Sequence, residues 1–313
     1  MFSGLTERLL PLQQHLLKPL MRSRVAVSIG ADQVTVLAHQ QRGQQLRLQS
    51  WQQAPLPPGL CEGGVPLHVE ALGDLIGDLL LQGAIQAPGA TALVPAPAVV
   101  LRVLELPPGL EAVQDPAALL QWLEPHAAAL ELPFALEVAS LSLQPRGDRW
   151  LAAFITQASL DAWIETFAVA GLELHGLEPE VLAIEPLLPS PDLEQPPLWR
   201  ACLDQRQQPW QLLLWQGQMP QLHRSLEPDQ AEPWLEQLLG QQGISLDALW
   251  LLPDAAEAWE PLQQHWQARL GCPVHGLDPY SHSSVVLPEQ GWLSPAPNQL
   301  DPLIAMALGR LQP

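Results

Sequence analysis

The same order of predicted strands and helices occurs twice along this chain, and that repetition limits the possible folds more than any other feature. In the first half, three β-rich runs at 25–29, 34–38 and 46–51 precede a helical pattern at 68–82 and a strand at 91–95. In the second half, runs at 198–203, 210–215 and 221–226 precede helices at 232–239 and 255–270. We therefore predict an α/β fold whose two related halves face each other across a cleft.

Extra segments in the first half predict a small inserted α+β subdomain. A strand is expected at 99–106, and a strand pair at 135–143 and 150–156 surrounds the turn residues Gly147 and Asp148. The segment 189–197 holds four prolines, which is typical of a linker. The predicted organisation is an arm at 1–24, a first domain at 25–188 with the insertion at about 99–172, the linker, and a shortened second domain at 198–313.

Charge and cysteine content restrict the class of protein. The formal net charge is −19 and Lys18 is the only lysine, which argues against a protein that grips nucleic-acid phosphates. The three cysteines form no CxxC pair, as expected in a reducing compartment. No stretch reaches the roughly 20 apolar residues of a membrane span, and the start of the chain does not have the pattern of a signal peptide. We expect a cytoplasmic protein.

The arm at 1–24 differs in charge from the rest of the chain. It carries four basic residues and one acidic residue, and leucines recur at helical spacing between Leu5 and Leu20. A short basic amphipathic helix of this kind can lie on an anionic membrane surface. Pro11 and Pro19 weaken such a helix, so a disordered arm or one docked on the core stays an alternative.

Several stretches, taken in order, resemble the PilM family of type IV pilus assembly proteins, which share a bacterial actin-like fold with FtsA. The resemblance covers essentially the whole chain. The stretches are 26–30 (AVSIG), 55–59 (PLPPG), 93–95 (LVP), 103–107 (VLELP), 132–134 (LPF), 170–172 (AGL), 270–274 (LGCPV), 278–280 (DPY) and 304–309 (IAMALG). The resemblance implies an actin-like (RNase H-like) two-domain fold.

The positions that would hold ATP in an actin-like protein depart from the family pattern. Ser28 stands where the family has Asp, Arg206 stands where a Gly follows the second hairpin, and Pro253 begins a loop where paired glycines are expected. Glycines in such loops let backbone amides approach phosphates closely. The positions of this vestigial cleft are Ser28, Gly30, Asp32, Asp204 and Asp254. We expect no ATP hydrolysis and no cofactor, and binding of ATP without turnover stays open.

By resemblance, the expected function is a non-catalytic scaffold. PilM proteins capture the cytoplasmic tail of PilN in a groove between the first domain and the inserted subdomain, and so join the alignment complex to the pilus platform and motor proteins. An extended tail can add to a strand edge. The candidate partner-binding residues are Val103, Trp122 and Phe134, with core packing as the alternative for each.

Three other readings stay open. One is a GspL-like component of a type II secretion platform, and another is a polymerising actin-like ATPase. The third is a metal site at Cys272, His275, Asp278 and His282, although their spacing matches no standard closed zinc site and we expect no metal.

Overall fold

The computed structural model describes residues 23–30, 32–105, 138–146, 149–188, 198–206, 208–217, 219–253, 259–288 and 300–309. Several predictions lie outside these ranges. They concern the arm up to residue 22, the linker at 189–197 and the candidate residues Trp122, Phe134 and Asp254.

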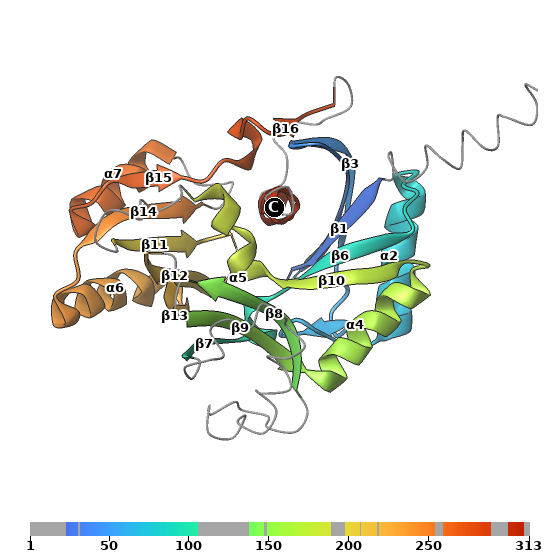
Figure 1. The fold of residues 1–313 in the computed structure, drawn as a ribbon, viewed down its shortest axis with the longest axis horizontal. Helices are drawn as coiled ribbons and strands as arrows, with labels where there is room; N and C mark the ends of the chain where they lie inside the picture. Colours follow the sequence, from blue (N-terminus) through green and yellow to red (C-terminus); the bar gives the residue numbers. More distant parts are fainter. Residues whose placement is uncertain are drawn as a thin grey trace, which may run out of the picture.

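The larger sheet of the first half contains six strands in the order β10-β6-β1-β2-β3-β16 (Figure 1). Strands β1 (Arg24–Ile29), β2 (Gln33–Arg42) and β3 (Gln45–Pro55) pair antiparallel, and Gly43 at φ +58° makes the turn between the last two. Strands β6 (Gly89–Val94) and β10 (Glu173–Pro179) continue the sheet in parallel. The short strand β16 (Val285–Val286) pairs parallel with β3 at the other edge.

The sheet of the second half repeats this arrangement. Its order is β13-β12-β11-β14-β15, in which β11 (Trp199–Asp204), β12 (Trp210–Gln216) and β13 (Met219–Leu226) are antiparallel. Strands β14 (Leu246–Leu252) and β15 (Val274–Gly276) are parallel to β11. In both halves the first strand lies in the middle, so the predicted duplication of the strand order is confirmed.

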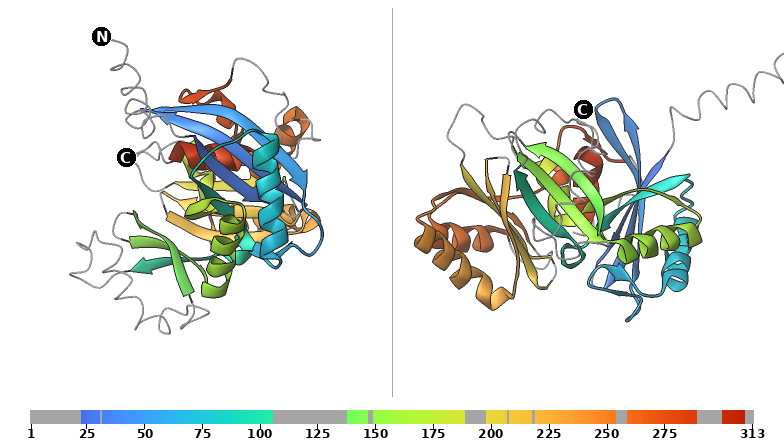
Figure 2. Two further views of the ribbon diagram at one scale, coloured as in Figure 1. Left: turned by 90° about the vertical axis from the view of Figure 1, so that its right-hand side faces the viewer. Right: turned by 60° about the horizontal axis from the view of Figure 1, so that its bottom comes forward.

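Two helices cover the outer face of each sheet, as the right-hand view of Figure 2 shows. Helices α2 (Val69–Gln82) and α4 (Gln157–Val169) pack on the first sheet, and α6 (Pro228–Gln242) and α7 (Trp259–Leu270) pack on the second. Strand alternation selects the side chains, since successive residues point to opposite faces. Val25 and Val27 of β1 pack in the outer core, between the first sheet and helices α2 and α4. Ala26 packs in the inner core, on the opposite face of the same sheet.

The inner faces of the two sheets are covered by helices exchanged between the halves. The short helix α5 (Glu180–Ala183) and the 3₁₀ turn η3 (Glu185–Leu187) follow the first sheet in sequence but pack on the second. Conversely, α8 (Leu300–Gly309) follows the second sheet and packs on the first, at the centre of the molecule in Figure 1. This corrects the predicted boundaries, because β16 and α8 were assigned to a second domain at 198–313 but complete the first sheet and its core.

The inserted subdomain is a three-stranded sheet in the order β7-β9-β8. Its strands are β7 (Val100–Glu105), β8 (Val138–Arg146) and β9 (Arg149–Thr156), close to the predicted ranges. The predicted insertion extended to 172, but α4 packs against α2 over the first sheet and so belongs to the first half. Thr156 caps α4, since its side chain accepts a hydrogen bond from the Ser159 backbone N–H at 3.2 Å.

The remaining elements are short. They are the strands β4 (Cys61–Glu62) and β5 (Val65–Pro66) and the 3₁₀ turns η2 (Ala96–Ala98) and η4 (Pro279–Ser281). The segment Glu180–Leu187 forms α5 and then η3 and not one longer α-helix, because Pro186 has no N–H to continue an α-helix. No helix in the part of the chain that the structure describes is long and apolar enough to cross a membrane.

The three cysteines are free thiols that differ in burial. Cys202 and Cys272 are buried, and Cys61 is partly exposed. Burial raises the pKa of all three thiols, most strongly that of Cys202, where the nearby Asp204 carboxylate raises it further. A raised pKa lowers the fraction of reactive thiolate at neutral pH.

We expect a thiol reagent to modify Cys61 first in the native protein, and Cys202 only after unfolding. Mass spectrometry of a labelling time course at pH 8 checks this order. The packing described here would be contradicted if Cys202 were labelled as fast as Cys61.

Candidate functional site

The first hairpin of the cleft, between β1 and β2, is closed by its own backbone. The Gly30 N–H donates to the Gln33 carbonyl at 2.8 Å, and the Asp32 carbonyl accepts from the Leu56 N–H at 2.7 Å. Ser28, at the position where the resemblance expects a carboxylate, is a buried residue. The Asp32 residue is exposed. This hairpin therefore presents a hydroxyl, and not a carboxylate, at the end of the central strand.

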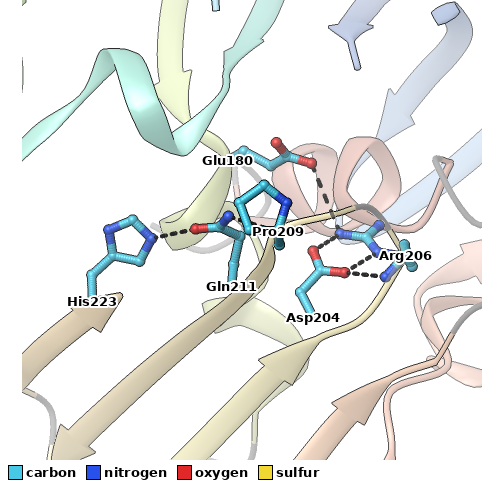
Figure 3. Close-up of polar contacts among 6 residues, drawn as sticks. All are labelled: Glu180, Asp204, Arg206, Pro209, Gln211 and His223. Carbon is cyan, nitrogen blue, oxygen red and sulfur yellow. Dashed lines mark hydrogen bonds and ion pairs between the residues drawn. The ribbon is translucent and has the colours of Figure 1, made fainter. Parts of the chain in front are cut away.

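The second hairpin, after β11, is held by an arginine that folds back on an aspartate (Figure 3). Asp204 is buried at the carboxyl end of the strand. Its Oδ1 accepts from the backbone N–H of Arg206 at 3.1 Å and from the guanidinium Nε of the same residue at 2.7 Å. Its Oδ2 accepts from Nη2 of Arg206. Both carboxylate oxygens of Asp204 are thus engaged by a bidentate partner.

The same guanidinium reaches the other half of the molecule. Nη2 of Arg206 lies 3.8 Å from Oε1 of Glu180, the first residue of α5. The two side chains are only 5% and 14% exposed, so the pair is poorly screened by water. Arg206 therefore lies between a carboxylate of each half, Asp204 and Glu180.

The cavity beside this cluster is small. Its volume is about 10 Å³, enough for about one water molecule. It is lined by Ala96, Glu180, Val181, Ile184, Cys202, Asp204, Gln211 and Leu213. Small-molecule sites are typically about 300–1,000 Å³, so this cavity is far below that range.

A polar network on β12 and β13 supports the second hairpin. The Gln211 side chain donates from Nε2 to the Pro209 carbonyl at 2.9 Å, and its Oε1 accepts from Ser225 Oγ at 2.9 Å. Oε1 also lies 3.0 Å from Nε2 of His223. Burial lowers the pKa of His223, which favours the neutral ring with its proton on Nε2. The network fixes Pro209 near the cluster seen in Figure 3.

The third loop of the cleft begins at Pro253, after β14. The Leu252 carbonyl accepts from the Gln205 N–H at 2.9 Å, which ties the end of β14 to the end of β11. Asp254 lies outside the described residues. Ser28, Gly30, Asp32 and Asp204 lie at or beside the ends of β1, β2 and β11, and Arg206 approaches Glu180 of the other half.

The candidate partner-binding residue Val103 lies in a packed environment. It is half-buried on β7 and packs against the inner core formed by α5 and the second sheet, which includes Trp215. The described structure therefore favours core packing for Val103. Trp122 and Phe134 lie outside the described residues, and their role stays a prediction.

The four residues considered for a metal have separate surroundings. Cys272 is buried in the core between the second sheet and helices α6 and α7, and the ring of His275 lies 5.7 Å from that of Trp250. Asp278 accepts from the Tyr280 N–H at 3.0 Å, and Nδ1 of His282 accepts from the Ser284 N–H at 3.2 Å. Within the described ranges, no group of three or more His, Cys, Asp or Glu residues could hold a metal ion.

Two sheets that share the same order of five strands, with their last helices exchanged across the cleft, define the actin-like fold. Comparison with solved structures identifies this fold in the chain. The chain is similar to the structure of a PilM–PilN type IV pilus biogenesis complex, with 19% identity and a TM-score of 0.67, covering 92% of this chain and 97% of that one. The resemblance to PilM is therefore confirmed at the level of the fold.

Other solved structures are less similar. A protein of unknown function with an actin-like ATPase fold, from Bacteroides thetaiotaomicron, has 8% identity and a TM-score of 0.51, covering 84% of this chain and 93% of that one. The cytoplasmic domain of EpsL, an inner-membrane component of the type II secretion system of Vibrio cholerae, has 14% identity and a TM-score of 0.48, covering 93% of this chain and 95% of that one. No protein-family model matches the sequence, and a search of curated proteins finds no match.

Proposed function

We propose that this protein is a non-catalytic scaffold of type IV pilus biogenesis. In this proposal it binds the cytoplasmic tail of a PilN-like inner-membrane protein and links it to the pilus platform. The observation that carries the non-catalytic part is the position of Arg206. Its guanidinium occupies both oxygens of Asp204 and approaches Glu180 across the cleft, so Asp204 is not available to hold Mg²⁺ and its waters.

The likeness to PilM along nearly the whole chain supports the pilus role. The edge of the inserted sheet is a candidate peptide-binding site. Strand β8 of the inserted sheet has β9 as its one strand partner in the described residues, and it lies close to β10 and α4. An extended tail could pair with β8 as an added strand and form main-chain hydrogen bonds with it. Every second side chain of the tail would then point toward the first half.

Charge indicates which tail would suit this place. Helix α4 exposes Asp161 and Glu165, and neither α4 nor the neighbouring α2 contains a basic residue. Acidic surface favours a partner of opposite charge and speeds its association. The tail should therefore carry Lys or Arg beside its extended segment. The basic arm at 1–24 would hold the protein near the inner membrane, where such a tail emerges.

A labelled PilN-type cytoplasmic tail peptide from the same genome, titrated with the protein and followed by fluorescence anisotropy, tests the proposal. We expect saturable binding in the micromolar range or tighter. Reversing the charges on α4 with Asp161→Arg and Glu165→Arg should weaken binding about tenfold or more at low salt, because two attractive charges become repulsive. Glu260→Arg, an exposed position on α7, is the matched control and should leave binding unchanged.

Substitution of Trp122 or Phe134 should also weaken the complex, if these residues line the groove. Failure of the folded protein to bind any such peptide would remove the pilus role, and it would direct attention to partners in a secretion platform. Light scattering with and without ATP separates the scaffold from a polymerising ATPase, because the scaffold should show no ATP-dependent increase.

A further inference from the structure

The segment that contains α5 and η3 carries a carboxylate near each end, and both face the second sheet. Glu180 approaches the guanidinium of Arg206, just after the carboxyl end of β11. Glu185, five residues on, accepts a hydrogen bond from Nε1 of Trp215 at 3.1 Å. The two contacts join residues that are far apart in the sequence, so each of them connects the first half of the chain to the second.

Arg200 adds a second cation near Glu185. It lies near the start of β11, is buried, and donates from Nη2 to the Gly217 carbonyl at 2.5 Å. Burial lowers the pKa of its guanidinium, and the nearby Glu185 carboxylate acts in the opposite direction. Glu180 thus approaches Arg206 just after one end of β11, and Glu185 lies near Arg200 at the other end, where Asp247 is a second nearby carboxylate.

An apolar contact lies between these two polar contacts. Val181, Leu182 and Ile184 are buried against the inner face of the second sheet, where Leu213 and Trp215 are also buried. Apolar contacts alone would let the segment shift along the second sheet, because the hydrophobic effect has no preferred direction. At one end of this surface Arg206 and Glu180 form an ion pair, and at the other end Glu185 accepts a hydrogen bond from Trp215, so the two polar contacts together favour one position of the segment.

We propose that residues 180–187 are a two-point fastening that holds the two halves closed without any bound ligand. Arg206 contacts both halves at once through Glu180 and Asp204, and a ligand bound in the cleft would join the halves in the same way. The proposal does not depend on the pilus role, because it concerns the relative placement of the halves and not the partner.

Hydrogen–deuterium exchange of the full chain, followed by mass spectrometry of its peptides, tests the fastening. We expect Arg206→Ala and Glu185→Ala each to speed exchange about tenfold or more in α5, β11 and β12, because these elements would open from one another locally. Exchange in α2 and α4, on the far side of the first sheet, should stay within about twofold of the original.

The control is Arg269→Ala. This arginine is also paired with carboxylates, Glu232 and Glu236, but all three residues lie on α6 and α7 within the second half. Its loss should leave exchange in α5 and β11 unchanged. If Arg206→Ala does not fold, Glu180→Gln keeps the shape of the side chain and removes its charge, and a smaller increase confined to the same elements is expected.

The fastening would be refuted if exchange in α5 and β11 were unchanged in both Arg206→Ala and Glu180→Gln. It would equally be refuted if Arg269→Ala raised exchange there as much as Arg206→Ala does. Addition of ATP and Mg²⁺ to the original protein should not slow exchange at these elements, because the closed arrangement is already complete. Strong ATP-dependent protection would show that a ligand, and not Arg206, closes the cleft.

Discussion

Replacement of Trp215 by alanine is expected to lower the free energy of unfolding by about 3–5 kcal/mol. The side chain is 1% exposed, on β12, and lies in the inner core between the second sheet and α5. Its removal leaves a cavity among rigid neighbours, which lose contacts that they cannot replace. It also removes the hydrogen bond to Glu185. Urea unfolding followed by circular dichroism measures the loss.

Trp215→Phe separates packing from hydrogen bonding. Phenylalanine fills most of the space but cannot donate to the half-buried Glu185 carboxylate, so we expect a loss of about 1.5–3 kcal/mol, the usual contribution of a hydrogen bond to a charged group. A loss below about 1 kcal/mol for the alanine variant would mean that the inner core is not packed between the halves as described.

Replacement of Gly73 by alanine is expected to destabilise the protein by about 1–3 kcal/mol, although alanine is the better helix former. Gly73 lies where α2 contacts α4. An added Cβ would be 2.6 Å from Cβ of Val169 and 2.7 Å from the Thr166 carbonyl oxygen, both shorter than a normal contact. One of the obstructing atoms is backbone, so relief requires the two helices to separate.

Gly240 provides a control of the opposite sign. It lies exposed on α6, and an added Cβ would meet nothing within 4 Å. Gly240→Ala should therefore stabilise the protein by about 0.5–1 kcal/mol, since only the helix propensity changes. Thermal or urea unfolding of both variants checks the pair. Two effects of the same sign would contradict the close contact between α2 and α4.

The repeated strand order could be predicted from the sequence because it depends on local signals. Gly43 between β2 and β3 marks a turn between β-rich runs, and apolar residues at helical spacing mark α2. The exchange of the last helices could not be predicted in this way. Residues 303–308 of α8 are all buried, so their sequence indicates a central helix but not which sheet it covers. Helix α8 was therefore assigned to the wrong half.

The contacts of Arg206 were not predicted from the sequence. Sequence reasoning identified the missing glycine at Arg206 as a loss, because it considered only what the backbone must do near phosphates. The contact with Glu180 depends on how the two halves are placed, and no local pattern contains that information. A usable signal was present, since an arginine two residues after an aspartate at a strand end can fold back on it.

If Arg206 closes the cleft, the purified full chain with Mg²⁺ should hydrolyse ATP at a rate no higher than the buffer background. Asp204→Ala should have no effect on that rate, because both oxygens of this carboxylate are already bound by Arg206. Hydrolysis above background that disappears in Asp204→Ala would contradict the account and identify a working ATPase.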